Sequence, residues 1–378
     1  MIAYKFKLYR NKHNAELDRL LREACFVWNH CLALQKRYYA LFGRYVPSAR
    51  MQKHFAKRYR MQSMHSQSVQ EVIQRLDAAY QRFFKRLAKR PPKFKRFADM
   101  TSVVYKQGGV TVEGNTLYVN KLKRKFRFSL SRKIEGNVKR VSVKKSPLGD
   151  YYVVVTTDAE PRRYGKTHDG AAVGIDFGLK TYLTLSDGTR IQSPQFLKRN
   201  LRDLRRASRR HSHAVKGSNN RERRRKELNR LHERVADSRR DWQWKLAHDL
   251  CRRYDYVFLE DLSLKGMSRM WGRKMGDLAH GEFVSILGQV AAKYGCVVHE
   301  IDRWFPSSRL CDCGYKNEKL TLDDREWVCP ECGQVHDRDV HAARNILRRG
   351  IDELESGGKT GTAQAAGHPH SDPRIPLL

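Results

Sequence analysis

The start of the chain changes from an alternating to a helical pattern of apolar residues. Residues 4–9 alternate apolar and polar side chains, which predicts one short strand. Apolar residues then recur every three or four positions over residues 17–38 and 69–87, which predicts two helices. The second helix is expected to begin with a Ser-x-x-Glu capping box at Ser68. These patterns predict a helical module over residues 12–90.

Residues 101–157 have a different pattern, made of short apolar runs rich in β-branched and aromatic side chains. Six such runs are separated by turns that contain Gly, Asn or Pro, which is typical of a β-sheet. We expect a small barrel or curled sheet that the strand at residues 4–9 joins. The helical module would then be an insertion between two strands. Residues 158–170 predict a linker.

Strands and helices alternate in the last part of the chain. Residues 173–185 predict a β-hairpin, and residues 198–250 predict two helices with a break between them. A strand, a helix and another strand follow between residues 254 and 300, and this order favours a parallel sheet. A short helix is expected at residues 340–349. From residue 356 onward, small and polar residues without an apolar period predict a mobile tail.

The charge of the chain indicates a class of partner. The 378 residues, enough for two or three domains, include 76 Lys and Arg against 40 Asp and Glu, a net charge of +36. A field of this sign binds polyanions by displacing their counterions, which favours nucleic acid. No run of 18 apolar residues is present, and the first residues lack the apolar core of a secretory signal. We therefore expect a cytosolic protein that does not bind membranes.

The cations are concentrated in several basic runs. Residues 198–240 hold 17 Lys or Arg and 5 Asp or Glu, and further basic runs lie at residues 86–96 and 121–127. One such run is usually a solvated helix face. Several runs in different modules favour a long groove for backbone phosphates.

A cysteine cluster near the end of the chain predicts a zinc site. Cys311, Cys313, Cys329 and Cys332 form two tight turns, each closed by a glycine. Tetrahedral zinc is bound by four such thiolates, and a reducing compartment favours metal over disulfides. The first turn has only one residue between its cysteines, and His336 is an alternative ligand. Four protein ligands leave no open position, so we expect a structural role.

Three carboxylates are candidates for catalysis. Asp176 and Glu260 each follow an apolar strand, and Asp339 lies at the start of the last helix. A single acid in such a place is usually a turn former or helix cap. Three in so basic a chain suggest that cations bind among them. Two Mg²⁺ or Mn²⁺ ions held by hard oxygen ligands are the usual means of hydrolysing a phosphodiester.

Five motifs occur in a fixed order along the chain. They are Gly-Ile-Asp-Phe-Gly at residues 174–178, Leu-Glu-Asp-Leu at 259–262, Pro-Ser-Ser at 306–308, the paired cysteine turns, and the segment from His336 to Ile346. In order and spacing they resemble the TnpB family, RNA-guided nucleases of bacterial transposons that are related to type V CRISPR effectors. The resemblance covers about residues 1–350.

The resemblance implies a multi-domain α+β protein. A β-barrel wedge domain would comprise residues 1–11 and 91–160, with a helical recognition insert at residues 12–90. An RNase H-like (RuvC) α/β nuclease domain at residues 161–304 and 335–350 would be interrupted by a zinc ribbon at residues 305–334. A flexible tail would complete the chain at residues 351–378.

The resemblance also implies an RNA-guided DNA endonuclease. A guide RNA from the transposon end would pair with target double-stranded DNA next to a short motif, and the nuclease would cut both strands in the bacterial cytosol or nucleoid. Asp176, Glu260 and Asp339 would bind Mg²⁺ or Mn²⁺, and the four cysteines would bind Zn²⁺. Asp337 is the alternative to Asp339, although Asp339 matches the register of the family's ligand.

Two other functions fit the composition. The chain could be an RNA-guided DNA-binding repressor that does not cut, or a basic RNA-binding module with a structural zinc. A repressor descended from this fold is expected to lack one or more of the acids. Because all three acids are present, the sequence favours the nuclease.

Overall fold

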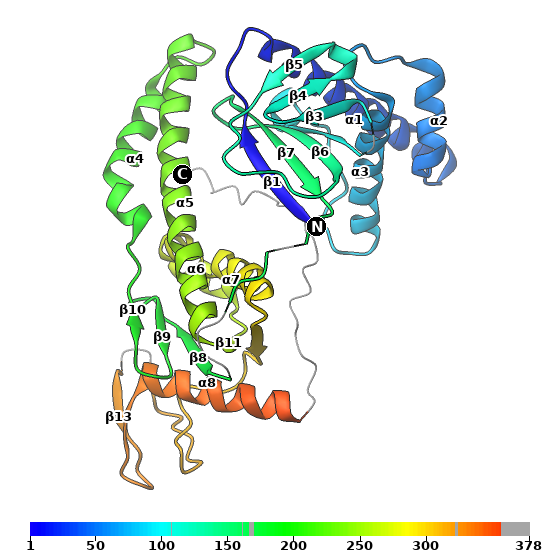
Figure 1. Ribbon diagram of the computed structural model, residues 1–378. Coiled ribbons are helices and arrows are strands. Elements are labelled where there is room, and N and C mark those ends of the chain that lie inside the picture. The colour runs from blue at the N-terminus through cyan, green and yellow to red at the C-terminus, as the bar shows by residue number, and fades with distance from the viewer. Residues whose placement is uncertain (107, 161, 166–169, 322–323, 357–378) are drawn as a thin grey trace. The chain divides into compact units, whose positions relative to one another are not determined.

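The chain divides into two units, Met1–Pro161 and Arg162–Leu378 (Figure 1). The computed structural model describes residues 1–106, 108–160, 162–165, 170–321 and 324–356. Much of the expected tail and part of the expected linker lie outside these residues. The first five residues of the expected tail instead continue the last helix, which ends at Glu355. None of the described helices is long and apolar enough to cross a membrane.

The N-terminal unit contains a four-stranded antiparallel sheet in the order β1-β7-β6-β2. The strands are β1 (Ile2–Lys7), β2 (Ser102–Tyr105), β6 (Val138–Lys145) and β7 (Tyr151–Thr157). As expected from the sequence, the first strand joins this sheet, with Ile2 opposite Thr157. The helices that follow β1 are therefore inserted between two strands of one sheet.

The expected barrel is wrong, because the described strands form two open sheets. The second sheet consists of β3 (Val110–Glu113), β4 (Thr116–Val119) and β5 (Arg124–Arg127). A bridge between Leu8 and Phe128 connects the two sheets. Strand β2 is an edge of the first sheet, where the Arg75 guanidinium donates to the hydroxyl and the carbonyl of Ser102 (3.2 and 3.3 Å). A helix side chain thus contacts the start of this edge strand, which pairs with β6 alone among the described strands.

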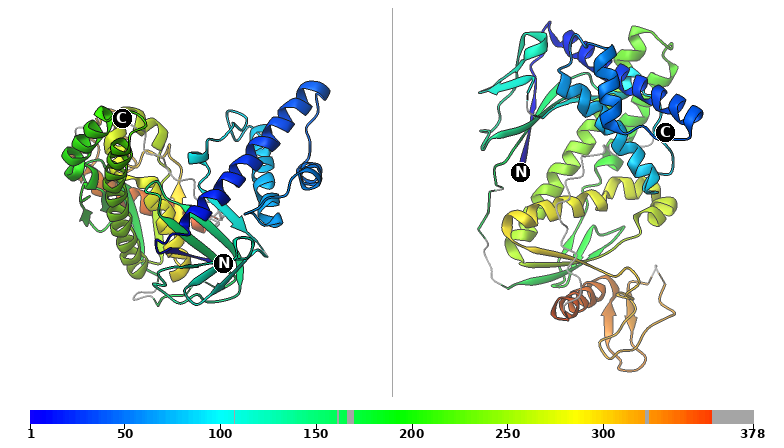
Figure 2. Two further views of the ribbon diagram at one scale, coloured as in Figure 1. Left: turned by 90° about the horizontal axis from the view of Figure 1, so that it is seen from above. Right: turned by 90° about the vertical axis from the view of Figure 1, so that its right-hand side faces the viewer.

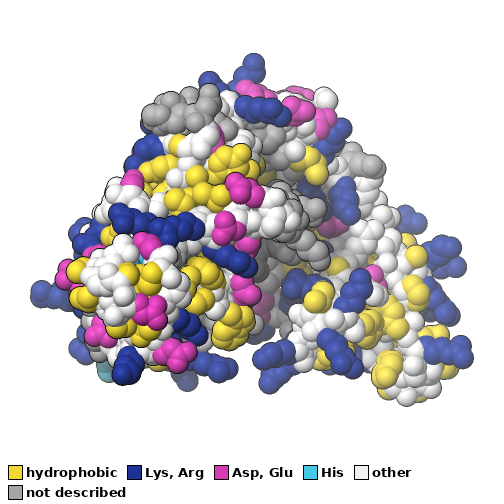
Figure 3. Space-filling view, turned by 90° about the horizontal axis from the view of Figure 1, so that it is seen from below, with side chains coloured by type: hydrophobic (Ala, Val, Ile, Leu, Met, Phe, Trp, Pro, Cys, Tyr) yellow, Lys and Arg dark blue, Asp and Glu magenta, His cyan; other side chains and the backbone are white. Residues whose placement is uncertain are grey.

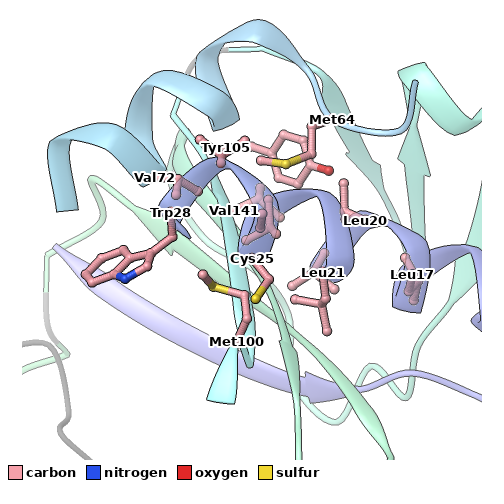
Figure 4. Close-up of a cluster of buried hydrophobic side chains, with 14 of the residues drawn as sticks. Leu17, Leu20, Leu21, Cys25, Trp28, Met64, Val72, Met100, Tyr105 and Val141 are labelled. Atoms are coloured by element: carbon pink, nitrogen blue, oxygen red, sulfur yellow. The ribbon is translucent and has the colours of Figure 1, made fainter. Parts of the chain in front are cut away.

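Two long helices and the sheet share one apolar core. These helices are α1 (Asn14–Phe42) and α3 (Ser66–Phe84). Leu17, Leu20 and Leu21 lie on one face of α1 and are fully buried in the cluster that contains Tyr105 and Val141 of the sheet (Figure 4). The helical period of the sequence therefore predicts this core correctly.

Two local features of the helical module differ from expectation. The short helix α2 (Ser48–Arg58) was not expected, because only Met51 and Phe55 are buried in it and they give little apolar periodicity. The capping box at Ser68 is wrong, since α3 already begins at Ser66. The imidazole of His65 caps this helix by accepting from the Gln67 amide.

The C-terminal unit contains a five-stranded mixed sheet in the order β10-β9-β8-β11-β12. The strands are β8 (Ala172–Phe177), β9 (Leu183–Leu185), β10 (Arg190–Ile191), β11 (Tyr256–Glu260) and β12 (Val297–Ile301). β8, β11 and β12 are parallel, whereas β9 and β10 form antiparallel pairs. The hairpin and the βαβ order that the sequence predicts are confirmed. Because β8 and β11 are parallel neighbours, they end at the same edge of the sheet.

Helices cover both faces of this sheet. α5 (Asn219–Arg253) and α7 (His280–Tyr294) share an apolar cluster with Val257 and Leu259 of β11. α8 (Arg338–Glu355) packs on the other face, where Phe258 belongs to a separate cluster. Alternate residues of a strand point to opposite faces, which explains why Phe258 and its two neighbours lie in different clusters.

A basic helical hairpin and one further helix complete the large elements of this unit. α4 (Phe196–His213) and α5 form the two-helix hairpin that the sequence predicts (Figures 1 and 2). α6 (Leu264–Leu278) was not expected. It contains three glycines, which are poor helix formers, and its backbone departs from helical geometry at Trp271.

Two glycines allow α8 to lie directly on the sheet. A Cβ atom on Gly174 of β8 would be 2.1 Å from the carbonyl oxygen of Ala343. A Cβ atom on Gly350 of α8 would be 2.0 Å from the Phe258 ring of β11. A larger side chain at either position would push the helix away from the strands. The short strands β13 (Glu326–Val328) and β14 (Val335–Asp337) form a separate ribbon immediately before α8.

Candidate active site and metal centre

Asp176 and Glu260 lie on neighbouring strands at one edge of the five-stranded sheet. Gly174 and Phe258 are partners in the parallel register, and the next residues of the same parity are Asp176 and Glu260. Both acidic side chains therefore point to the face that α8 covers. Because adjacent strands are about 4.8 Å apart, the two carboxyl groups are neighbours.

Asp339 lies in the first turn of α8, on the same face of the sheet. It precedes Ala343 by four residues, so the two side chains share one face of the helix. The Ala343 carbonyl contacts Gly174, two residues before Asp176. The close packing of α8 on β8 thus brings the third acid to the edge where the other two lie.

The electrostatics of the site centre on Asp176, which lies within range of the charges of the other two acids. Burial and then the negative charges of Asp339 and Glu260 raise the pKa of Asp176 to about 7. Burial also raises the pKa of Glu260 to about 7, against the effect of a hydrogen bond with Ser307, which lowers it. Clustered carboxyl groups with raised pKa values are typical of sites that hold cations or transfer protons.

The three carboxylates are not arranged as a finished metal cage. Within the described ranges, the cysteines form the one group of three or more potential ligands whose atoms lie within 4.8 Å of one another. Asp339 instead forms ion pairs with Arg325 and Arg338, each at 3.1 Å. The acids are therefore in electrostatic range, with one of them held by guanidinium groups.

Asp337, the alternative to Asp339, is used for helix capping. Its carboxylate accepts from the Val340 amide at 3.0 Å and pairs with Arg190. Although burial opposes them, the Val340 amide and the Arg190 guanidinium lower the pKa of Asp337. Asp337 thus has the role of an N-cap, whereas Asp339 is the acid whose charge acts on Asp176.

The four predicted cysteines come together in space. The sulfur atoms of Cys311 and Cys332 are 3.5 Å apart, and those of Cys313 and Cys329 are 3.6 Å apart. The short first turn therefore places both of its cysteines in the cluster. Four sulfur atoms at this spacing fit one tetrahedral ion, and the donor set is typical of zinc.

His336, the alternative zinc ligand, lies beside the cysteine cluster. Its Nε2 atom is 3.1 Å from the Cys311 sulfur, and its ring contacts that of His341 in a tilted arrangement, with centroids 3.9 Å apart. His336 is 3% exposed and is not among the four residues whose ligand atoms converge. It therefore contacts a cysteine sulfur from outside the set.

Several polar residues near the acids had no role assigned from the sequence. Ser307 hydrogen-bonds to Glu260, and Asn345 of α8 donates to the carbonyls of Ser307 and Leu310, both at 2.8 Å. Ser307 lies in the Pro-Ser-Ser motif and Asn345 in the segment from His336 to Ile346, so the motifs were the sequence signal that could have identified them. Arg338 also lies in that segment, whereas Arg325 gave no signal, because it is one among 76 cationic residues.

Two family models match consecutive parts of the chain. The model described as "OrfB_IS605: Probable transposase" matches residues 152–270, which include Asp176 and Glu260. The model described as "Cas12f1-like, TNB domain" matches residues 280–346, which include the four cysteines and Asp339. The candidate acids and the cysteine cluster thus lie within the matched segments.

Two known proteins are similar to nearly the whole chain. A Streptomyces pristinaespiralis protein named "Putative RNA-guided DNA endonuclease" is 33% identical over 363 residues, which are 92% of this chain and 89% of that protein. The Escherichia coli K12 protein "Putative RNA-guided DNA endonuclease InsQ" is 28% identical over 94% of both chains. The fold resembles a chain of the "Cas12f1-sgRNA-target DNA complex", with a TM-score of 0.57 and 16% identity over 89% of this chain and 83% of that one. The chain therefore belongs to the OrfB_IS605 family, the TnpB proteins that its motifs resemble.

Proposed function

We propose that this protein is an RNA-guided DNA endonuclease of the bacterial cytosol or nucleoid. It uses a guide RNA from the transposon end and cleaves complementary double-stranded DNA next to a short target-adjacent motif. The observation that carries the proposal is the placement of Asp176 and Glu260 at the ends of neighbouring parallel strands, with Asp339 on the helix packed against them. The charges of Glu260 and Asp339 raise the pKa of Asp176, in agreement with this placement. The names of the two relatives support the same activity.

The donor set of the acidic site fits Mg²⁺ or Mn²⁺. Carboxylate oxygens are hard ligands, and the mutual repulsion of Asp176, Glu260 and Asp339 favours a cation among them. When bound, a pair of such ions neutralises charge on a phosphodiester and activates water. The three carboxylates must be ionised to bind metal, so protons compete with metal at the two groups whose pKa values are raised.

Residues around the acids orient them for this task. Ser307 hydrogen-bonds to Glu260 and is tied to α8 through Asn345. Gly174 lets α8 pack closely on β8, which places Asp339 near Asp176 and Glu260. Such surrounding contacts fix the direction of a ligand before metal arrives. We assign them a positioning role.

The four cysteines bind one structural Zn²⁺ in this proposal. All four positions of a tetrahedral ion are filled by protein, so this site has no place for a substrate. The second cysteine turn joins the ribbon strands β13 and β14, and β14 leads directly into α8. Zinc therefore stabilises the segment that leads into the helix bearing Asp339.

Basic surfaces bind the guide RNA and the target DNA. Lys and Arg side chains are spread over much of the face that Figure 3 shows. The α4–α5 hairpin contributes many of the 17 cations of residues 198–240. Contacts of this kind grip a heteroduplex by its backbone, while base pairing with the guide supplies sequence specificity.

We propose that the segments divide this work as in the family. Residues 1–11 and 91–160 form the wedge, as open sheets rather than a barrel, and residues 12–90 form the recognition insert. The nuclease comprises residues 161–304 and 335–350, with the zinc ribbon at residues 305–334.

A reconstituted cleavage reaction tests the proposal. The full chain, copurified with its guide RNA, is incubated with matching duplex DNA in Mg²⁺, and the products are sized on a gel. We expect cleavage of both strands that stops when EDTA is added. The matched control is a duplex that lacks complementarity to the guide and should remain intact. DNA that is bound but not cut in Mg²⁺ or Mn²⁺ would contradict the nuclease and favour a repressor.

A further inference from the structure

Both oxygens of the Asp339 carboxylate are held by arginines. Arg325 donates from Nη1 to Oδ2 at 3.1 Å and to Oδ1 at 3.3 Å. Arg338 donates to Oδ1 from Nη2 at 3.1 Å and from Nε at 3.3 Å. The Asp339 side chain is 17% exposed, so these charge-assisted bonds lie in a partly desolvated environment.

Arg325 comes from the zinc ribbon rather than from the sheet or from α8. It immediately precedes β13, and its carbonyl accepts from the Arg338 amide at 2.8 Å. In the next ribbon pair, Glu326 lies opposite Asp337. The hairpin register therefore places a ribbon guanidinium against a nuclease carboxylate.

The two arginines differ in how firmly they are held. The Arg338 side chain is 14% exposed and also donates to the Thr321 carbonyl at 3.1 Å. The Arg325 side chain is 43% exposed, so it has access to solvent. A guanidinium bonded to a carboxylate oxygen prevents that oxygen from coordinating a cation directly. Of the two arginines, Arg325 can be displaced at the smaller cost.

We propose that Arg325 is a positioning residue that competes with divalent cations for the Asp339 carboxylate, so that the zinc ribbon sets the metal affinity of the nuclease site. This inference rests on the proposed function, because it requires metal at the three acids. It adds a residue outside the nuclease sheet to the control of that metal. Arg325 holds Asp339 in place and leaves it when a cation binds.

Mn²⁺ binding to the zinc-loaded full chain tests the proposal. Free Mn²⁺ is measured by electron paramagnetic resonance for the wild type, Arg325→Gln and Arg190→Gln. Arg190 is a matched control, because it is similarly exposed, pairs with Asp337 and feels the charge of Asp339. Both variants lose one positive charge near the site. We expect Arg325→Gln to bind Mn²⁺ about three- to fivefold more tightly than Arg190→Gln, the scale of a partly exposed ion pair.

Other outcomes separate this inference from the proposed function. Equal Mn²⁺ affinities in the two variants, or weaker binding by Arg325→Gln, would overturn the role of Arg325. Slower cleavage by Arg325→Gln with unchanged Mn²⁺ affinity would also overturn it and indicate a contact with DNA. Wild-type Mn²⁺ binding that Asp176→Asn leaves unchanged would instead contradict the proposed metal site.

A second variant guards against misfolding. Arg325→Lys keeps the charge but loses the planar fork of donors, so we expect an Mn²⁺ affinity between those of the wild type and Arg325→Gln. An affinity for Arg325→Lys below that of the wild type would contradict the competition. Zinc content and thermal unfolding are measured on each variant, and both should match the wild type.

Discussion

The cysteine cluster and the acidic cluster are assembled in different ways. The four thiols come from two turns within a span of 22 residues, and their sulfur atoms lie within 4.8 Å of one another. The three acids come from β8, β11 and α8, and they meet only because the sheet and the helix pack together. One site depends on local chain geometry, whereas the other depends on the tertiary structure of the whole unit.

The chemistry of the ligands explains why only one cluster is tightly gathered. Protonated thiols are neutral and can approach one another at little cost. Carboxylates repel, and this repulsion, added to burial, raises the pKa of Asp176 to about 7. Arginines offset the charge of Asp339. A cluster of acids therefore needs countercharge, from arginine or from metal, before its carboxylates can come close together.

The largest expected effect is the loss of cleavage when an acid is removed. Asp176→Asn keeps the shape of the side chain but removes a negative metal ligand, so we expect cleavage to fall about a thousandfold or more. Guided DNA binding, measured by gel shift, should remain near the wild-type level. Asp187→Asn is the control, because Asp187 lies in the turn between β9 and β10. Full cleavage by Asp176→Asn would break the assignment.

The next largest effect is expected at the cysteine cluster. Cys329→Ser replaces a soft ligand by a hard one, so zinc should fall from about one ion per chain to near zero by elemental analysis. Cys296→Ser, outside the cluster, should retain its zinc. Equal zinc content in Cys329→Ser and Cys296→Ser would contradict the assignment of Cys329 as a zinc ligand.

A substitution in β8 is expected to disturb the acidic site without affecting zinc binding at the cysteine cluster. Gly174→Ala places a Cβ atom against the Ala343 carbonyl and should lower the free energy of unfolding by about 1–3 kcal/mol. Cleavage should fall as α8 moves, while zinc content stays unchanged because the cysteine turns are local. Gly276→Ala is the control, since a Cβ atom there meets no atom within 4 Å. Wild-type cleavage and stability in Gly174→Ala would contradict the close packing.

The smallest effect concerns pH. The raised pKa of Asp176 means that the folded chain holds its proton more tightly than the unfolded chain, so its stability falls as pH rises from about 4 to about 7. We measure the free energy of unfolding in urea without added divalent cations. The difference between Asp176→Asn and the wild type should shift in favour of the variant by about 2 kcal/mol as pH rises from 5 to 8.

The pKa of Asp187 is shifted in the opposite direction, so its effect on the free energy of unfolding has the opposite pH dependence. Although burial opposes them, hydrogen bonds from Thr189 lower the pKa of Asp187. Ionised Asp187 therefore stabilises the fold above its ordinary pKa, and that stability is lost as pH falls through its lowered value. Asp187→Asn should lower stability at neutral pH. If the free energy of unfolding changed with pH in the same way in Asp176→Asn and Asp187→Asn, the opposite pKa shifts of the two acids would be contradicted.

The sequence predicts local and periodic features well. The apolar period of α1, the hairpin at β8 and β9, and the parallel order of β11 and β12 are all confirmed. The elements missed are α2, with two buried residues, and the glycine-containing α6. The barrel was wrong because strand patterns do not encode which strands pair: β1 and β2 are the two edges of one sheet, and β3, β4 and β5 form another.

The two candidate sites also differ in how far the sequence predicts them, because one depends on local spacing and the other on tertiary packing. The cysteines are recognisable because their spacing is itself the geometry of the site. The acids are recognisable as strand ends, but the parity that turns Asp176 and Glu260 toward α8 requires the register of the sheet. The pairing of Arg325 with Asp339 depends on the ribbon hairpin lying beside α8, and no short spacing encodes that contact.

The proposed cleavage requires that Asp176, Glu260 and Asp339 jointly bind divalent metal. The most direct test is anomalous X-ray scattering from crystals of the full chain with its guide RNA, soaked in Mn²⁺. We expect a manganese peak bounded by carboxylate oxygens of all three residues. Manganese bound at Asp337, with any of the three carboxylates uncoordinated, would contradict it.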